Sequence, residues 1–293
     1  MKSRFISVVV TISLLLFFNG IGICLDKGST ADVVDKVGQG NINWSAGYIE
    51  AVGTGAPPEK LAGKINARPT ALRAAQADAV HNLLEITKGV QVDSVTSIKD
   101  FTVGSDVVDT QVRGLVKGAE VVDQQYLPEG KAEVRLRIPL YGNLAQTIMP
   151  LAMAKPPAAP SSTGSVPAPA VKAFLAPSAP LVQTGIVVDA RGIQARPAML
   201  PRIFDEDGKE VYGLASVDLE YAIKNGMSGY VRDLTAAQTN QRAGANPITV
   251  KAVRISGPGK SDIIIGNADA RQVRTSAEKV SFLKQCKVMI VLD

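Results

Sequence analysis

The scarcity of histidine limits the reactions that this chain could catalyse. The single His81 excludes every metal site that needs two or more imidazoles. Its neighbours at helical spacing are Asp78 and Glu85, so we interpret it as a solvated imidazole between carboxylates. A serine hydrolase using His81 would need its nucleophile on a sharp turn, and the chain has no Gly-x-Ser-x-Gly segment.

Two glycine-lysine pairs resemble the end of a phosphate-binding loop, and each departs from it. At Gly63-Lys64 the required hydroxyl residue is replaced by Ile65, and Pro58 stands at the first glycine position. Gly259-Lys260-Ser261 keeps the hydroxyl but has Arg254 at that position, and it leads into a predicted strand where the motif requires a helix. We predict that both pairs are turns.

The acidic cluster Asp205-Glu206-Asp207-Gly208 is predicted to be a hairpin turn. It lacks the alternating oxygen ligands of a calcium loop, and Ser216 stands where that loop needs its closing glutamate. We therefore expect no catalytic, cofactor-binding or metal-binding residue, no cofactor, and no enzyme. Spacing alone leaves a pair of hydrolytic carboxylates open, and Asp262 and Asp269 would be the first to substitute.

The first residues are typical of an export signal. Lys2 and Arg4 form a basic start, and an apolar run of 14 residues follows from Phe5 to Phe18. A bilayer span needs about 20 residues. We expect residues 1–24 to be a signal peptide that is cleaved on export, which leaves the mature chain in the periplasm; an uncleaved anchor is the alternative.

Cys24 determines whether a lipid could anchor the mature chain to a membrane. The segment Ile21-Gly22-Ile23-Cys24 resembles a lipobox, in which the cysteine becomes the lipidated first residue, although the position before that cysteine is normally small. Ordinary cleavage before Leu25 also fits, with small residues at Gly22 and Cys24, and so does cleavage after Gly22. Cys24 is therefore a candidate for lipidation, which would anchor the chain to the outer membrane.

The charge balance argues against a nucleic-acid-binding protein, and the cysteine content argues against a protein stabilised by disulfide bonds. The chain has 32 basic and 27 acidic residues, and loss of Lys2 and Arg4 with the signal brings the two nearer to balance. No basic run is interleaved with aromatic residues, so we expect no nucleic-acid partner. Cys286 becomes the last thiol of a mature chain that starts after Cys24, so no intramolecular disulfide is expected. We interpret Cys286 as a small buried hydrophobic residue at the start of a strand.

Residues 150–182 are predicted to be a linker between two domains. Eight of the 17 prolines lie between residues 150 and 180, among alanine and serine and without an acidic residue. Such a composition is typical of an extended, semi-rigid spacer. It separates residues 45–149 from residues 183–293, and each part has the size of one small domain.

The first domain is predicted to pack one amphipathic helix on a sheet. A strand at residues 45–53 precedes a helix from about Pro69 to Gly89. One face of that helix is apolar and consists of Leu72, Ala75, Ala79, Leu83 and Ile86. We expect a second strand within residues 112–126, and the alternation of apolar and charged residues across 132–138 predicts a third.

The second domain is predicted to be a mixed sheet with one long helix. The predicted strands and hairpins lie at residues 185–189, 202–213, 248–265 and 288–292, and the helix runs from Asn267 to about Lys284. Residues 217–246 have weak periodicity and no assignment. The fold class is α+β, with two small domains that each place one long helix on a mixed or antiparallel sheet.

Three segments of the first domain resemble the Lpp-twenty lipoprotein family, which has a FlgP-like flagellar branch. They are Ala71 to Gly89, Val112 to Ala119, and Tyr126 to Gly130 with the strand that follows, so the resemblance covers residues 47–142. It implies one helix on a small sheet, an outer-membrane or periplasmic setting and, for the flagellar branch, subunits of a ring or disk. It implies no catalytic residues, and the lipidation common in the family is at odds with Ile23. Residues 183–293 resemble no family known to us.

These observations predict a non-enzymatic assembly or interaction protein of the cell envelope. Strand edges and helix faces of the first domain would join neighbouring copies, and the linker would let the second domain reach another layer. The expected partners are further copies, other envelope or flagellar proteins and the inner surface of the outer membrane. The alternative is a soluble periplasmic module that binds peptidoglycan or a small ligand, with the pocket in the second domain.

Overall fold

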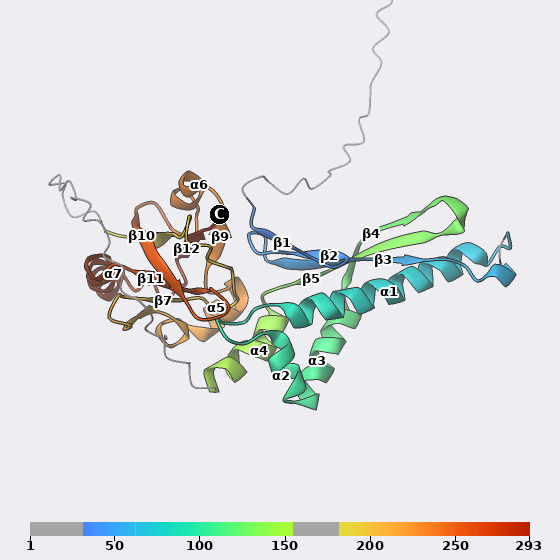
Figure 1. Ribbon diagram of the computed structural model, residues 1–293, viewed down its shortest axis with the longest axis horizontal. Coiled ribbons are helices and arrows are strands. Elements are labelled where there is room, and N and C mark those ends of the chain that lie inside the picture. The colour runs from blue at the N-terminus through green and yellow to red at the C-terminus, as the bar shows by residue number, and fades with distance from the viewer. Residues whose placement is uncertain (1–31, 62, 155–181) are drawn as a thin grey trace, which may run out of the picture.

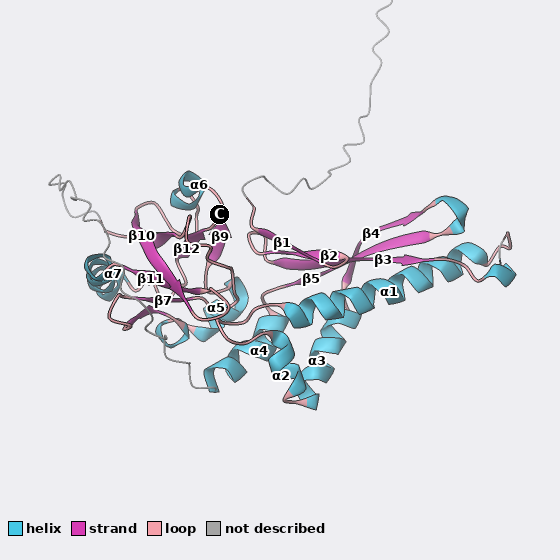
Figure 2. Ribbon diagram, viewed as in Figure 1, coloured by secondary structure: helices cyan, strands magenta, loops and turns pink. Residues whose placement is uncertain are grey.

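A computed structural model describes residues 32–61, 63–154 and 182–293, which form two sheets with helices packed on them (Figure 1). Figure 2 shows helices and strands mixed in both halves, and the chain is α+β as predicted. The predicted signal peptide with Cys24, and most of the predicted linker, lie outside the described residues. No helix within the described ranges combines the length and apolar character that crossing a bilayer requires.

The N-terminal domain is built on a five-stranded antiparallel sheet with the strand order β1-β2-β3-β5-β4. The strands are β1 (Val34–Val37), β2 (Gly40–Asn43), β3 (Tyr48–Gly55), β4 (Glu120–Tyr126) and β5 (Ala132–Pro139). The hairpin of β1 and β2 precedes residue 45, where we expected the domain to begin. Its two-residue turn depends on Gly38, which has a φ of +52°.

Helix α1 (Ala67–Gly89) lies along β3 and β5 with the predicted face inward. Ala75, Ala79, Leu83 and Ile86 are buried, and Leu72 is partly buried, which confirms the predicted face. The helix approaches the sheet closely because β3 carries Gly53. A Cβ atom at Gly53 would lie 2.0 Å from the backbone nitrogen of Ala79.

The prediction of a strand across residues 112–126 was wrong in its first half. Helix α3 (Asp106–Lys117) occupies that part, and β4 begins only at Glu120. Val108, Val112 and Val116 recur every fourth residue and are all buried, which is a helical spacing. Their β-branched side chains favour strands, so composition misled where periodicity did not.

Three more helices complete this domain, so α1 is not its only helix. Helix α2 (Ile98–Val103) and helix α4 (Asn143–Ala154) pack with α3 on the same side of the sheet as α1 (Figure 1). The single-turn helices η1 (Glu59–Leu61) and η2 (Pro128–Gly130) lie in the loops.

The C-terminal domain is built on a seven-stranded mixed sheet with the order β8-β7-β11-β10-β6-β12-β9. Its strands are β6 (Gly185–Asp189), β7 (Arg202–Phe204), β8 (Glu210–Tyr212), β9 (Gly229–Val231), β10 (Pro247–Ser256), β11 (Asp262–Ile265) and β12 (Val288–Val291). Its helices are η3 (Leu214–Ser216), α5 (Leu219–Asn225), α6 (Leu234–Gln238) and α7 (Asn267–Val280).

This sheet confirms the predicted strands at both ends of the domain and both predicted hairpins. The α7 helix ends at Val280, before the expected Lys284, because Ser281 adopts a left-handed conformation with a φ of +55°. Residues 217–246, which had no assignment, contain α5, β9 and α6.

The two domains are in direct contact. Backbone carbonyls of the loop after α1 accept hydrogen bonds from backbone N–H groups of the C-terminal domain: Gln91 from Met199 (3.1 Å), Val92 from Leu200 (2.8 Å) and Ser94 from Gly259 (2.7 Å). One hydrophobic cluster contains buried residues of both domains. The two domains therefore pack against each other, and the expectation that the second domain reaches another layer or partner stays a prediction.

Candidate functional site

The residues with potential chemistry are engaged in separate structural roles. His81 is exposed on α1, and its neighbour Asp78 accepts a hydrogen bond from the backbone N–H of Thr54 (2.9 Å). Asp205 is buried in the β7–β8 hairpin, where Arg274 donates to its carboxylate (2.8 Å). Across the described ranges, no group of three or more His, Cys, Asp and Glu side chains could hold a metal ion.

Asp262, one of the two carboxylates open to a hydrolytic role, belongs to a buried ion pair. Arg202 donates to both of its oxygens (3.1 and 2.6 Å), and the hydroxyl of Ser94 donates to one of them (2.6 Å). Asp269 lies on a different element, α7, and burial raises its pKa. The arrangement links the two domains, and the carboxylate of Glu210 on β8 lies near enough to Asp262 that burial and, after it, repulsion from Asp262 raise the pKa of Glu210.

The second glycine-lysine pair forms a turn, as predicted, between β10 and β11. Lys260 takes a left-handed conformation with a φ of +59°, and its ammonium donates to the side chain of Gln194 (3.2 Å). The turn borders a groove between the two domains, so Lys260 becomes part of a surface that the sequence did not predict.

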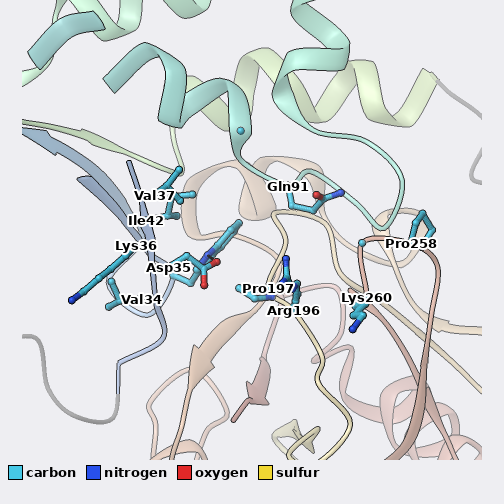
Figure 3. A pocket seen from close by; sticks show the side chains of 13 residues that line it. Val34, Asp35, Lys36, Val37, Ile42, Gln91, Arg196, Pro197, Pro258 and Lys260 are labelled. Atoms are coloured by element: carbon cyan, nitrogen blue, oxygen red, sulfur yellow. Dashed lines mark hydrogen bonds between the residues drawn. The ribbon is translucent and has the colours of Figure 1, made fainter. Parts of the chain in front are cut away.

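This groove has a volume of about 900 Å³ and runs beside β1, at the junction of the domains (Figure 3). Cavities of about 300–1,000 Å³ at domain junctions are common ligand sites. The N-terminal domain contributes Val34, Asp35, Lys36, Val37, Ile42, Trp44, Gly89 and Gln91, and the C-terminal domain contributes Arg196, Pro197, Pro258, Gly259 and Lys260. All four residues of β1 line it.

Basic side chains outnumber acidic ones around the groove. The lining includes the basic residues Lys36, Arg196 and Lys260 and one acidic residue, Asp35, whose carboxylate accepts a hydrogen bond from the indole N–H of Trp44 (2.9 Å). Lys36 and Arg196 form no ion pair with any residue that the structure describes. In Figure 3, Arg196 stands on the wall opposite Asp35, and Lys36 extends away at the rim. The groove therefore suits an anionic group.

Strand β1 presents a free edge to the groove, because it is the outermost strand of its sheet. The backbone N–H of Trp44 donates to Val33 (2.9 Å), so residues 33 and 44 are a hydrogen-bonded pair. Hydrogen-bonded and non-hydrogen-bonded pairs alternate along an antiparallel ladder. The main-chain groups of Val34 and Lys36 therefore point away from β2.

Strand β4 is the other free edge of the same sheet, and all seven of its residues are exposed. The backbone N–H of Leu127 donates to Lys131 (2.8 Å), and the same alternation directs the main-chain groups of Gln124 and Tyr126 outward. Glu120 and Asp123 make this edge acidic. The sequence predicted a strand here but gave no signal that the strand would lack a second neighbour.

Cys286 is fully buried, which confirms its interpretation as a small hydrophobic residue. Burial raises the pKa of its thiol, so the reactive thiolate is disfavoured at neutral pH. No catalytic role follows from its position.

Residues 185–293 match a family model described as Treponema pallidum Tp0624, second domain. The match begins at the first residue of β6 and covers the whole seven-stranded sheet, but none of the N-terminal domain. No curated protein matches the chain. The resemblance of residues 47–142 to the Lpp-twenty family stays a prediction.

Proposed function

We propose that this chain is a non-enzymatic assembly protein of the cell envelope, which joins copies of itself through the edges of its N-terminal sheet. The observation that carries the proposal is β4, a seven-residue edge strand with every residue exposed. Unpaired edge strands template pairing with another chain. Main-chain hydrogen bonds of this kind require little side-chain specificity, which suits a repeated contact.

Proteins that stay monomeric usually protect such edges. They use proline, a covering helix or loop, a very short strand, charged side chains or a bulge. Strand β4 carries Glu120 and Asp123 and a shift in its pairing with β5 between Val121 and Asp123, but it contains no proline and exposes the apolar side chains of Val121, Val122 and Tyr126. Its hairpin with β5 extends away from the C-terminal domain, so neighbouring copies can reach it (Figure 1).

The test compares the mature chain, residues 25–293, with its Gln124→Pro variant by light scattering and sedimentation velocity. We expect the unaltered chain to self-associate as its concentration rises. Proline at Gln124 removes an N–H that points outward and keeps the β4–β5 hydrogen bonds, so it should weaken association without unfolding the hairpin. The Gln124→Ala variant is the matched control. A mature chain that stays monomeric at every concentration would refute the proposal.

The envelope location rests on residues 1–24 and is tested separately. Mass spectrometry of the purified protein would show an acylated Cys24 for an outer-membrane anchor, or an unmodified Leu25 for a free periplasmic chain. An intact Met1 on cytosolic protein would contradict both.

The groove favours a second candidate function, a binding module for peptidoglycan or a small acidic ligand. Three cations at a domain junction could hold carboxylates of such a ligand. Co-sedimentation with purified peptidoglycan tests it: the Lys36→Glu, Arg196→Glu double variant should lose retention, and Gln124→Pro should not.

A further inference from the structure

The two free edges of the N-terminal sheet differ in charge and in surroundings. Strand β4 carries Glu120 and Asp123 and lies open, whereas β1 lies in the groove with Lys36, Arg196 and Lys260. Edge strands of opposite charge are suited to each other, because cross-strand pairs of opposite charge stabilise a sheet. This inference rests on the proposed function and names the surfaces that meet.

Pairing of β4 with β4 of another copy is disfavoured by its own sequence. An antiparallel pair centred on the middle residue would set Asp123 of one copy against Asp123 of the other. Like charges directly opposite each other destabilise a sheet. The partner of β4 should therefore be a basic edge, and within the described residues β1 is the other free edge of this sheet.

Strand direction is compatible with this pairing. Four antiparallel pairings separate β1 from β4 in the order β1-β2-β3-β5-β4, so the two edge strands run in the same direction. Each also directs the main-chain groups of two residues outward, Val34 and Lys36 in β1 and Gln124 and Tyr126 in β4. A neighbour in the same orientation would continue the sheet by a parallel pair.

We propose that β4 of one copy enters the groove of a second copy and adds to β1 as a further strand. The acidic strand β4 then lies in the groove that carries Lys36, Arg196 and Lys260 of the neighbour. Each copy offers one strand and one groove, so the contact is head to tail. Such contacts close into a ring or continue as a filament.

The test uses two charge reversals in the mature chain. The strand variant carries Glu120→Lys and Asp123→Lys, and the groove variant carries Lys36→Glu and Lys260→Glu. In each variant alone, strand β4 and the groove carry charges of the same sign, so each variant should associate roughly tenfold more weakly than the unaltered chain. Mixed, the basic strand of one meets the acidic groove of the other, and oligomers of the original size should return.

Control variants distinguish an effect of the charge reversal on association from an effect on folding. Glu59→Lys with Glu85→Lys makes the same change in net charge as the strand variant, at exposed positions outside β1 and β4, and should leave association unchanged. Circular dichroism checks that each variant folds. Asp123→Asn and Lys36→Gln, which keep the side-chain size, are the milder pair if a reversal unfolds the sheet, and each should weaken association.

The outcomes distinguish this inference from the proposed function. If the unaltered chain associates but both variants behave like the control, or if mixing restores nothing, the pairing of β4 with the groove is refuted while self-assembly stands. If the unaltered chain is monomeric throughout, both proposals fail. Restoration only in the mixture supports the head-to-tail contact.

Discussion

The hydroxyl of Ser94, in the N-terminal domain, donates to the carboxylate of Asp262, in the C-terminal domain, over 2.6 Å, and each residue is 1% exposed. Arg202 donates to the same carboxylate and to Ser94 (3.2 Å). A buried ion pair is therefore completed by a side chain from across the domain boundary. The free energy of unfolding of the two domains should be coupled through it.

We predict that Asp262→Ala destabilises the chain by about 3–5 kcal/mol, because it removes the carboxylate that accepts two hydrogen bonds from the buried Arg202 guanidinium. Ser94→Ala removes a hydrogen bond to a charged group and should cost about 1.5–3 kcal/mol. Urea denaturation followed by circular dichroism measures both. Asp207→Ala, an exposed acid in the β7–β8 turn, is the control and should stay within about 0.5 kcal/mol. An Asp262→Ala variant as stable as this control would contradict the prediction.

The sequence predicted the elements whose pattern is local. The apolar face of α1 repeats at helical spacing, and β5 alternates between buried and wet residues, so periodicity alone located both. Composition misled the prediction at α3, where valines at positions 108, 112 and 116 have a helical spacing but are residues that favour strands. Periodicity missed the β1–β2 hairpin, whose four-residue strands are too short for a clear period.

The candidate surfaces were beyond sequence reasoning for a different reason. The groove joins Lys36, Arg196 and Lys260 from three distant segments, and only the docking of the domains brings them together. That docking combines a shared hydrophobic cluster with single hydrogen bonds such as Ser94 to Asp262, and no local periodicity encodes either. The composition of residues 150–182 favoured a boundary but carried no information on whether the parts on either side touch.

The close packing of α1 on β3 predicts how substitution of Gly53 changes the stability of the chain. Gly53→Ala places a Cβ atom 2.0 Å from the Ala79 nitrogen and 2.4 Å from the Ala75 carbonyl oxygen, so backbone must move. We expect a loss of about 1–3 kcal/mol, as for other overpacked cores. The matched control is Gly114→Ala inside α3, where the added Cβ meets nothing within 4 Å. That change should stabilise the chain by about 0.8–1.0 kcal/mol. The thermal denaturation temperature should fall for Gly53→Ala and rise for Gly114→Ala, and a Gly53→Ala variant as stable as the unaltered chain would contradict the close approach.

Asp189 supplies a prediction of pH dependence. It ends β6, and Arg191 donates to both of its carboxylate oxygens (2.8 and 3.0 Å). These hydrogen bonds lower the pKa of Asp189 to about 2, against the opposing effect of burial and with a smaller contribution from Lys251. In the unfolded chain an aspartate titrates near its ordinary value of about 3.9.

Because the folded pKa lies below the unfolded one, the carboxylate stabilises the fold fully above about pH 5 and loses that effect as the pH falls towards 2. Asp189→Asn should therefore be less stable than the unaltered chain at neutral pH, and the difference in free energy of unfolding should shrink between about pH 4 and pH 2. Urea denaturation across that range measures it. Arg191→Gln removes the largest cause of the shift and should show the same convergence. A difference that stays constant down to pH 2 would mean that the ion pair does not form in solution.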